Sequence, residues 1–437
     1  MSRLPCLRYM VTDSTLFRTG LNYMAFYRTH PMVGPHYGDF HLERQWTQAP
    51  SKFLCLGQVG AMHIKVELRE FLPPAGSTDV DLKGRPMYAV PWAVADPDAV
   101  VESITKYIDR GITRYMSAYL DDTDPLVWNI FQTAYRASVF PVPVSRTTPS
   151  TTSSLLTRPQ NEMLKKTLRL WVACRFIESK WRCWSESGWA DSDIRAMNPQ
   201  DPFYNDLDSL PPYIDYQIAS VIIQRILGPL RKDVLRDLQK TFNTHSPRDW
   251  FATFLTSFIL LQNYEMQSLF QRQFAERRRA KVQYLDMPLV RATNSGAKTI
   301  LAHFHYCYKG QQLFTPGFDW SAPRVRRMAK LDAEQIAFMA QCRDVVVKKG
   351  KVLSLSFPRY SARGSDRNSP DVSEDQHHGY VPREVVVHQP AVRPRLESAQ
   401  HPRACPTSRA PERGLILLFS SWRRPIHSVV LCSSPLV

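Results

Sequence analysis

Residues 164–176 read LKKTLRLWVACRF, and the spacing of their apolar side chains predicts the dominant kind of element in this chain. The apolar side chains recur every three or four residues, which is the period that places them on one face of an α-helix. They are Leu164, Leu168, Trp171, Val172 and Phe176. The stretch therefore predicts an α-helix with a broad apolar face.

Start signals predict further helices on both sides of this stretch. Residues 96–97 and 124–125 are Asp-Pro pairs, in which an N-cap side chain precedes a proline at the first helical position. Residues 246–249 (SPRD) resemble a capping box, and residues 332–335 (DAEQ) open another helix. These signals predict a mainly α fold.

Three more segments add predicted helices. Residues 250–261 are the longest apolar stretch, but they are shorter than the roughly 20 residues that a bilayer span needs. They therefore predict a buried core helix. Residues 213–240 predict an amphipathic helix that we expect to break at Gly228-Pro229, and residues 297–308 predict a further short helix.

One segment has the pattern of a strand. Residues 62–69 (MHIKVELR) alternate apolar and charged side chains, which is typical of a strand with one buried face. A second extended piece is expected at residues 87–90, between Gly84 and Pro91. We therefore expect a mainly α fold with a small β element near residues 60–90.

Composition divides the chain into four expected parts. Residues 1–140 form an N-terminal α+β segment, and residues 141–158 (PVPVSRTTPSTTSSLLTR) form a linker. Residues 159–350 form a helical domain. Residues 351–437 are rich in proline, serine and arginine and have little periodicity, so they predict a disordered tail. A mis-spliced or frameshifted end would also explain this change in character.

Composition also limits the class of protein. The chain has 437 residues, is 43% hydrophobic and carries a formal net charge of +16, so it can bury a core and favours acidic partners. Its eight cysteines are scattered without a C-x-x-C pair, which argues against a zinc module or a disulfide scaffold. Residues 1–10 lack an apolar core segment, so no secretory signal is expected.

Three candidate chemical sites each have a simpler structural explanation. His303, His305 and Cys307 are possible metal ligands or a nucleophilic pair, but no second cluster converges on them, so we expect core packing. Residues 121–124 (DDTD) precede a proline and are expected to cap a helix. Residues 297–299 (AKT) lack the glycines of a phosphate-binding loop.

Aromatic side chains crowd the region after residue 170. They are Trp171, Trp181, Trp184 and Trp189, with Tyr213 and Tyr216 downstream. They could line an apolar ligand pocket, but we expect them to build the core. We predict no catalytic, cofactor-binding or metal-binding residue, no cofactor and no enzymatic activity.

Two basic patches are candidate binding sites. Arg277, Arg278, Arg279 and Lys281 form the densest basic run, which could serve as a nuclear-localisation signal or bind phosphates. A looser patch has the same possible uses and consists of Arg324, Arg326, Arg327 and Lys330. A solvated helix face is the alternative for both patches.

Several stretches resemble the regulatory region of fungal transcription factors of the zinc binuclear-cluster type. The resemblance covers residues 1–345 and lies in the segments 168–178 (LRLWVACRFIE), 222–232 (IIQRILGPLRK), 249–251 (DWF) and 295–306 (SGAKTILAHFHY). Upstream it includes residues 39–41 (DFH), 81–92 (DLKGRPMYAVPW) and 119–124 (YLDDTD).

The resemblance implies a nuclear protein that controls genes, often those of fungal secondary metabolism. In that family a head with six cysteines holds two zinc ions and places a helix in the major groove. None of the cysteines of this sequence has that spacing. Zinc binding and sequence-specific DNA recognition are therefore assigned to no residue here.

The sequence therefore predicts a helical transcriptional regulator, or a regulator-like protein, without its own zinc-cluster head. We expect nuclear localisation and partners in the transcription machinery or a DNA-binding paralogue. We expect no membrane association and no direct DNA contact. An interaction or scaffold protein without a role in gene control is the first alternative. An enzyme of a fungal biosynthetic pathway, with the tryptophan-rich region as its pocket, is the second.

Overall fold

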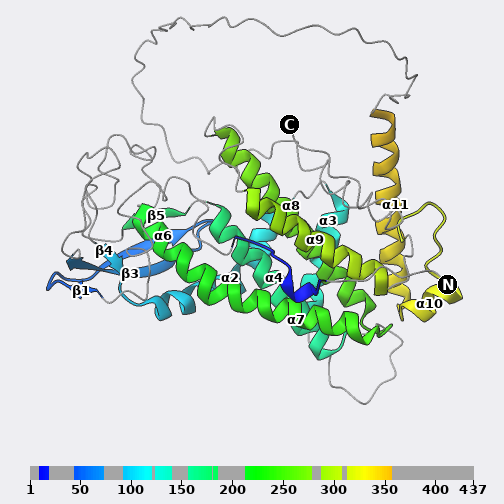
Figure 1. Cartoon of the computed structure of the whole chain (residues 1–437), viewed down its shortest axis with the longest axis horizontal. Helices are drawn as coiled ribbons and strands as arrows, with labels where there is room; N and C mark the ends of the chain where they lie inside the picture. The colour runs from blue at the N-terminus through cyan, green and yellow to red at the C-terminus, as the bar shows by residue number, and fades with distance from the viewer. Residues whose placement is uncertain are drawn as a thin grey trace, which may run out of the picture.

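Helices make up most of the described chain, with a small antiparallel sheet at one end (Figure 1). The structure is a computed structural model that describes residues 9–18, 44–72, 92–120, 124–139, 156–179, 181–185, 212–277, 287–307 and 313–356. Its helices are α2 (Pro97–Tyr119), α3 (Pro125–Val139), α4 (Arg158–Glu178), α6 (Pro212–Val221), α7 (Gly228–Thr244), α8 (Trp250–Arg277), α9 (Met287–Cys307), α10 (Pro323–Met328) and α11 (Ala333–Ser356). The predicted fold class is confirmed.

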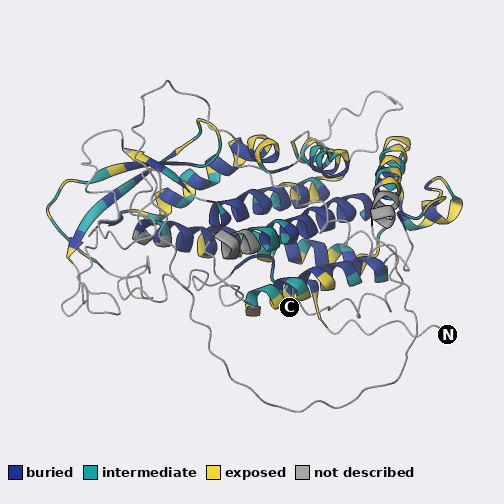
Figure 2. Ribbon diagram, turned by 90° about the horizontal axis from the view of Figure 1, so that it is seen from above, coloured by how far each residue is buried: buried dark blue, intermediate teal, exposed yellow. Residues whose placement is uncertain are grey.

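Helix α4 lies at the centre of the helical body. It contains the predicted helix at residues 164–176, and every side chain from Leu170 to Glu178 is buried. Helices α2, α3, α7 and α8 all contact α4. Figure 2 shows that the helices in the middle of the body are mostly buried. A helix that is buried on every side is stable only when neighbouring elements cover it, so α4 organises the packing of the other helices.

Helix α8 is the second buried helix. Every residue from Trp250 to Asn263 is buried, which confirms the core helix predicted at residues 250–261. The helix then continues to Arg277. It packs against α3, α4, α7 and α9. None of the described helices is long and apolar enough to cross a membrane.

Five short strands form the sheet. They are β1 (Gln45–Trp46), β2 (Lys52–Gly57), β3 (Ile64–Leu72), β4 (Trp92–Val94) and β5 (Arg182–Ser185), in the order β1-β3-β2-β5, with β4 also pairing with β3. Strand β3 confirms the strand predicted at residues 62–69, and its alternate side chains from Ile64 to Leu68 are buried. Strand β2 lies within the N-terminal α+β segment, where the sequence predicts no strand before residue 62. The extended piece expected at residues 87–90 lies outside the described residues.

The predicted break at Gly228-Pro229 is wrong, because the helix continues through these residues. Between α6 and α7 the chain forms a π-helical segment, η4 (Ile222–Leu227). The amide of Gly228 donates to the carbonyl oxygen of Ile223, five residues earlier. Proline has no N–H to donate back to the preceding turn, and the wider π-turn before Pro229 accommodates this loss without a break.

The N-caps before α2 and α3 follow the predicted start signals. Asp96 Oδ1 accepts hydrogen bonds from the amides of Asp98 (2.8 Å) and Ala99 (3.0 Å). Asp124 Oδ1 accepts one from the amide of Leu126 at 3.1 Å. The short helix predicted at residues 297–308 is the second half of α9, which begins at Met287.

Elements from both sides of the predicted linker share one core. Most of residues 141–158 lie outside the described chain, and α4 begins at Arg158. Strand β5 pairs with β2, and a single hydrophobic cluster contains side chains from before and after the linker. Of the predicted tail, residues 351–356 belong to α11, and the remainder lies outside the described residues.

A glutamine in the β2–β3 connection joins the sheet to the end of α4. Gln58 Nε2 donates to the carbonyl oxygens of Phe176 (3.4 Å) and Ser179 (2.9 Å). The hydroxyl of Tyr115 donates to Gln58 Oε1 at 2.9 Å. Carbonyls at the end of a helix have no partner within the helix, so Gln58 supplies the missing bonds.

We expect Gln58→Ala to lower the free energy of unfolding by about 1–3 kcal/mol, because it leaves these partly buried groups without partners. Urea unfolding measures the change. Lys106→Ala is the control, because its ion pair with Glu102 is exposed. We expect Lys106→Ala to change the free energy by less than about 0.5 kcal/mol. Equal effects of the two substitutions would show that Gln58 does not join the two parts.

Candidate functional site

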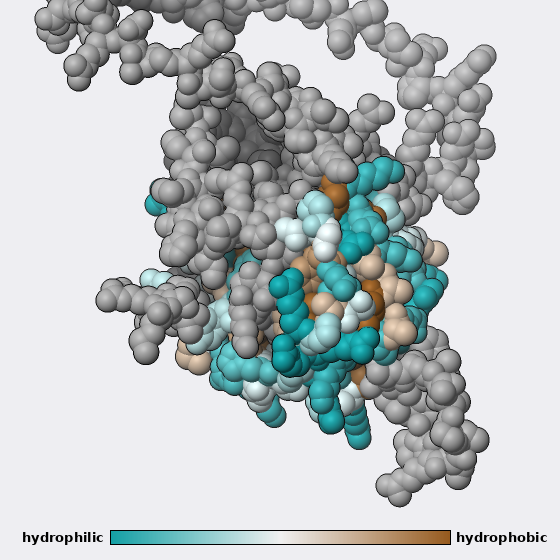
Figure 3. Space-filling model, turned by 90° about the vertical axis from the view of Figure 1, so that its right-hand side faces the viewer, coloured by the Kyte–Doolittle hydropathy of each residue, from teal (hydrophilic) through white to brown (hydrophobic). Residues whose placement is uncertain are grey.

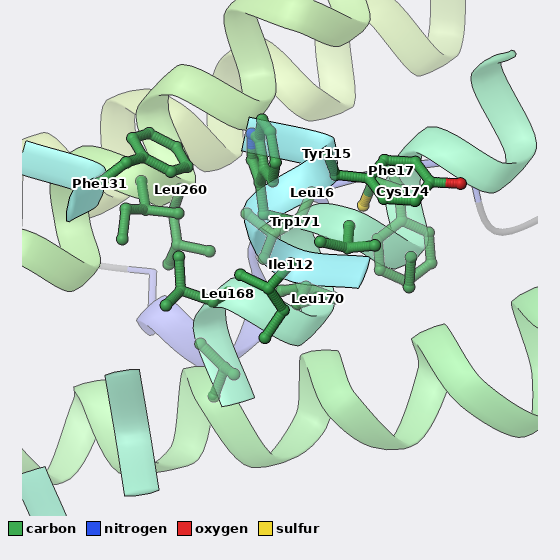
Figure 4. Close-up of a cluster of buried hydrophobic side chains, with 14 of the residues drawn as sticks. Leu16, Phe17, Ile112, Tyr115, Phe131, Leu168, Leu170, Trp171, Cys174 and Leu260 are labelled. Atoms are coloured by element: carbon green, nitrogen blue, oxygen red, sulfur yellow. The ribbon is translucent and has the colours of Figure 1, made fainter. Parts of the chain in front are cut away.

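A segment near the N-terminus lies buried across the helical body. Residues 9–18, here called the strap, contain a short 3-10 turn (Val11–Asp13) followed by extended chain. In Figure 1 the dark blue strap runs beside α7 and α9. Its most buried apolar side chains are Val11, Leu16 and Phe17. Figure 4 shows Leu16 and Phe17 among core side chains of α4, including Trp171 and Cys174.

Side chains of the body bond to the main chain of the first half of the strap. His303 on α9 places Nε2 2.9 Å from the carbonyl oxygen of Tyr9, where it can donate a hydrogen bond. Gln239 on α7 accepts a hydrogen bond from the amide of Val11 at 2.7 Å. Both bonds fix the path of the strap without depending on its side chains.

The second half of the strap is bonded in the same way. Arg231 Nε on α7 donates to the carbonyl oxygen of Ser14 at 2.9 Å. Burial lowers the pKa of the Arg231 guanidinium, and the charge of Asp13 opposes this shift. Asn263 Nδ2 on α8 donates to the carbonyl oxygen of Leu16 at 3.0 Å. Three helices therefore contribute polar side chains to one binding surface for the strap.

The strap can approach α9 closely because residue 296 is glycine. A Cβ atom there would lie 2.8 Å from the carbonyl oxygen of Thr15 and 2.9 Å from its nitrogen. It would also lie 3.2 Å from Cβ of Ser14. The Ser14 hydroxyl donates to the carbonyl oxygen of Gly296 at 3.4 Å. Only a glycine leaves room for the strap at this point of the helix.

Arg175 lies at the centre of the site and is completely buried. Its Nη2 donates to Asn263 Oδ1 at 2.6 Å and pairs with Glu178 Oε2 at 3.0 Å. Its guanidinium also lies 5.4 Å from the centre of the Trp171 ring. Since Asn263 also bonds the strap at Leu16, the buried charge of α4 is linked through α8 to the strap.

A second arginine connects the end of the strap to the same cluster. Arg18 Nη2 donates to the carbonyl oxygen of Ile177 at 3.0 Å, and its charge acts on Glu178. Burial raises the pKa of Glu178 from its ordinary value of 4.5 to about 7, and the charges of Arg175 and Arg18 oppose this shift. The carboxyl group of Glu178 therefore titrates near neutral pH.

The cluster holds structure together and offers no activated nucleophile. Burial raises the pKa of the Cys174 thiol to about 12, and the charge of Glu178 adds to the shift. A thiol with so high a pKa stays protonated and unreactive at neutral pH. Trp171 Nε1 is also satisfied internally, because it donates to Gln262 Oε1 at 2.8 Å.

The candidate ligands on α9 pack inside the protein. His303 bonds the strap and stacks on Phe242. Burial lowers the pKa of His305 to about 4 and raises that of Cys307 to about 12. Cys307 Sγ donates to the carbonyl oxygen of Phe242 at 3.4 Å. In the described part of the chain, no group of three or more histidine, cysteine or acidic side chains could hold a metal ion.

The remaining candidates are partly described. Trp171 and Trp181 are core residues, whereas Trp184 is 39% exposed and packs edge-on against His63. Trp189 and residues 121–123 lie outside the described residues, as do the side chains of Tyr213 and Tyr216. Residues 297–299 lie inside α9 and form no loop.

The two basic patches differ in how much of them the structure describes. Helix α8 ends at Arg277, and Arg278, Arg279 and Lys281 lie outside the described residues. In the second patch all four side chains are exposed on or just after α10, whose Val325 is buried. Figure 3 shows this end of the molecule, where hydrophilic side chains cover much of the described surface.

Sequence reasoning missed the strap and its binding surface. Residues 1–60 have poor periodicity, and a 3-10 turn followed by extended chain produces no repeating pattern. A signal was nevertheless present, because Arg175 and Glu178 interrupt the apolar run of a buried helix. Charges in such a position require buried partners, although the sequence does not say which residues supply them.

Comparisons with known proteins identify relatives. A family model described as "KpeA transcription factor" matches residues 54–369. The satratoxin biosynthesis SC3 cluster transcription factor SAT20 of Stachybotrys chartarum is 21% identical over 175 residues, which are 38% of this chain and 24% of that relative. The chain therefore matches about a quarter of that protein's length. No solved structure matches the chain.

The raised pKa of Glu178 predicts a specific pH dependence of stability. Because the folded-state pKa of about 7 exceeds the ordinary value of 4.5, the folded protein binds the extra proton between these pH values. The free energy of unfolding therefore falls as pH rises through this window, by at most about 3 kcal/mol from this group. Glu178→Gln removes the titration, so the wild type should lose stability relative to this variant between pH 5 and pH 7.5.

Urea unfolding at a series of pH values measures both proteins. Glu162→Gln, on the exposed side of α4, is the matched control and should keep the pH slope of the wild type. Parallel profiles for the wild type and Glu178→Gln would show that Glu178 has no raised pKa.

Proposed function

The chain belongs to the KpeA transcription factor family, and on this premise we propose that it is a nuclear regulator of a fungal biosynthetic gene set. The family model covers residues 54–369, which includes α4, α8 and most of the helical body. This match is the observation that supports the proposal most directly. The resemblance to the regulatory region of fungal zinc-cluster factors supports the same function.

The type of target genes follows from the relative. Its printed name assigns SAT20 to the satratoxin biosynthesis SC3 cluster in Stachybotrys chartarum. We extend this to the present chain as control of a secondary-metabolite gene cluster. We propose the same kind of gene set for this chain, and we do not propose that its product is satratoxin.

The way in which the chain reaches its genes is proposed from the family match and from the charge of the sequence. The formal net charge is +16, which favours acidic partners. We propose that the helical body acts through a DNA-binding paralogue or through proteins of the transcription machinery.

The candidate site supports a regulator better than an enzyme. Its polar groups bond to each other and to the main chain of the strap, as shown by Arg175 with Asn263 and by Asn263 with Leu16. Such contacts hold a segment in place and leave no free acid-base pair at Arg175. Binding and release of segments is the chemistry that a regulatory protein needs.

Deleting the gene should lower the transcripts of a coherent set of genes, and returning the intact 437-residue chain should restore them. RNA sequencing of the wild-type, deleted and restored strains measures the effect. A strain restored with a chain carrying an early stop codon is the control. Transcripts that stay unchanged under several growth conditions would contradict gene control and favour a scaffold protein.

The densest basic run is proposed to direct nuclear entry. Replacing Arg277, Arg278, Arg279 and Lys281 with alanine should lower the nuclear fraction of a fluorescently tagged chain several-fold, because import receptors bind clustered positive charge. The matched control replaces the second patch, which also has four cations: Arg324, Arg326, Arg327 and Lys330. An unchanged nuclear fraction for the first variant, or an equal loss for both, would contradict the assignment.

A further inference from the structure

The groove that holds the strap binds it mainly through its main chain. Four body side chains bond main-chain atoms spread along the strap: His303 at Tyr9, Gln239 at Val11, Arg231 at Ser14 and Asn263 at Leu16. The partners come from α7, α8 and α9, and the strap itself contains only a short 3-10 turn, Val11–Asp13. The surface of α7, α8 and α9 that contacts the strap, here called the groove, therefore holds a peptide segment by its main chain at four points.

Side chains of the strap make the recognition specific. Val11, Leu16 and Phe17 are buried by the body, and Ser14 packs where α9 has Gly296. Arg18 bonds the end of α4 through the carbonyl oxygen of Ile177. Together these contacts select an extended segment with apolar side chains at three positions, a small residue at a fourth and an arginine at its end.

A groove that has lost its own strap favours a ligand that makes the same polar and apolar contacts. Removing the strap leaves Asn263, Gln239 and Arg231 with one bond fewer each and exposes the apolar wall behind Leu16 and Phe17. Unpaired polar groups beside an exposed apolar wall are costly, so the groove favours any ligand that restores both kinds of contact. The segment that restores all of them is the strap of a second copy.

The segment that follows the strap in the sequence is long enough for the strap to reach the groove of a second copy. Residues 19–43 separate Arg18 from Arg44, which makes 43 − 18 = 25 residues. An extended chain of that length spans roughly 80–90 Å, which is enough to reach the groove of a neighbouring copy. Tyr9 and Met10 at the other end are 68% and 53% exposed, so nothing in the described chain closes over that end.

We propose that the strap is an exchangeable ligand and that the groove of one copy takes residues 9–18 of a second copy, which links two chains. The contacts are identical within one chain and between two chains, so the balance depends on concentration. A connection of 25 residues gives the strap an effective concentration of roughly millimolar within its own chain. Exchange therefore becomes detectable when docking within the same chain is blocked.

Two complementary full-length variants provide that test. Gly296→Ala closes the groove, because the new Cβ would meet the main chain of Thr15, and leaves the strap intact. Leu16→Ala combined with Phe17→Ala weakens the strap and leaves the groove intact. Each variant alone should be a monomer. Their mixture should form a 1:1 complex with about twice the chain mass of 50.4 kDa, measured by light scattering after size exclusion.

Gly111→Ala is the matched control for the closed groove. Gly111 lies in α2, and a Cβ there would make only ordinary contacts of 3.4 Å with Met62 and Tyr115. This chain keeps its own strap docked, so its mixture with the weakened-strap variant should stay largely monomeric. No complex in the first mixture, or equal complex in both mixtures, would overturn the proposal. Circular dichroism checks that each variant is folded.

A cleavable chain keeps the proposal testable if the double-alanine variant does not fold. A protease site placed within residues 19–43 of the otherwise intact chain allows the strap to be cut while it is docked. A fluorescent peptide of sequence YMVTDSTLFR should then replace the cut strap and raise the fluorescence anisotropy at least several-fold more than a peptide with alanine at Leu16 and Phe17. Equal binding of the two peptides, or no replacement, would overturn the proposal.

Discussion

Arg175 places a positive charge in the last turn of α4, where it is completely buried, and the arrangement of the body follows from the partners that this charge requires. An unpaired buried charge costs far more free energy than a domain can spare. Asn263 and Glu178 supply oxygen atoms, and the ring of Trp171 adds a cation–π contact. Helix α8 must therefore lie against α4 with Asn263 beside Arg175.

Asn263 also bonds the N-terminal strap. Its amide nitrogen bonds the carbonyl oxygen of Leu16, so the atoms of one side chain join α4, α8 and a segment 247 residues away in sequence. The sheet is joined to the same end of α4 by Gln58, which bonds carbonyls at Phe176 and Ser179. The C-terminal end of the central helix α4 is therefore fixed by polar side chains from both α8 and the β2–β3 connection.

The extent to which sequence predicts this structure depends on the range of the interactions. Local signals were sufficient for helix starts, because Asp96 caps its own helix, and for β3, because its side chains alternate. They failed at Gly228-Pro229, where the helix continues. Burial of the preceding isoleucines outweighs the helix-breaking tendency of proline, and a π-turn accommodates the missing hydrogen bond. They also failed at the strap and at Asn263, because these partners are brought together only by the tertiary fold. The comparisons identify the family, whereas the contacts that hold the strap come only from the structure.

A double-mutant cycle on Arg175 and Asn263 tests most directly whether the buried charge and the asparagine hold each other in place. The variants Arg175→Met, Asn263→Leu and the combination of both are compared with the wild type by their free energies of unfolding in urea. We expect the double variant to be destabilised by less than the sum of the two single variants, by on the order of 1–3 kcal/mol. The reason is that each single change leaves the other group buried without its partner. Strictly additive losses would contradict it, since they would mean that the buried charge and the asparagine do not hold each other in place.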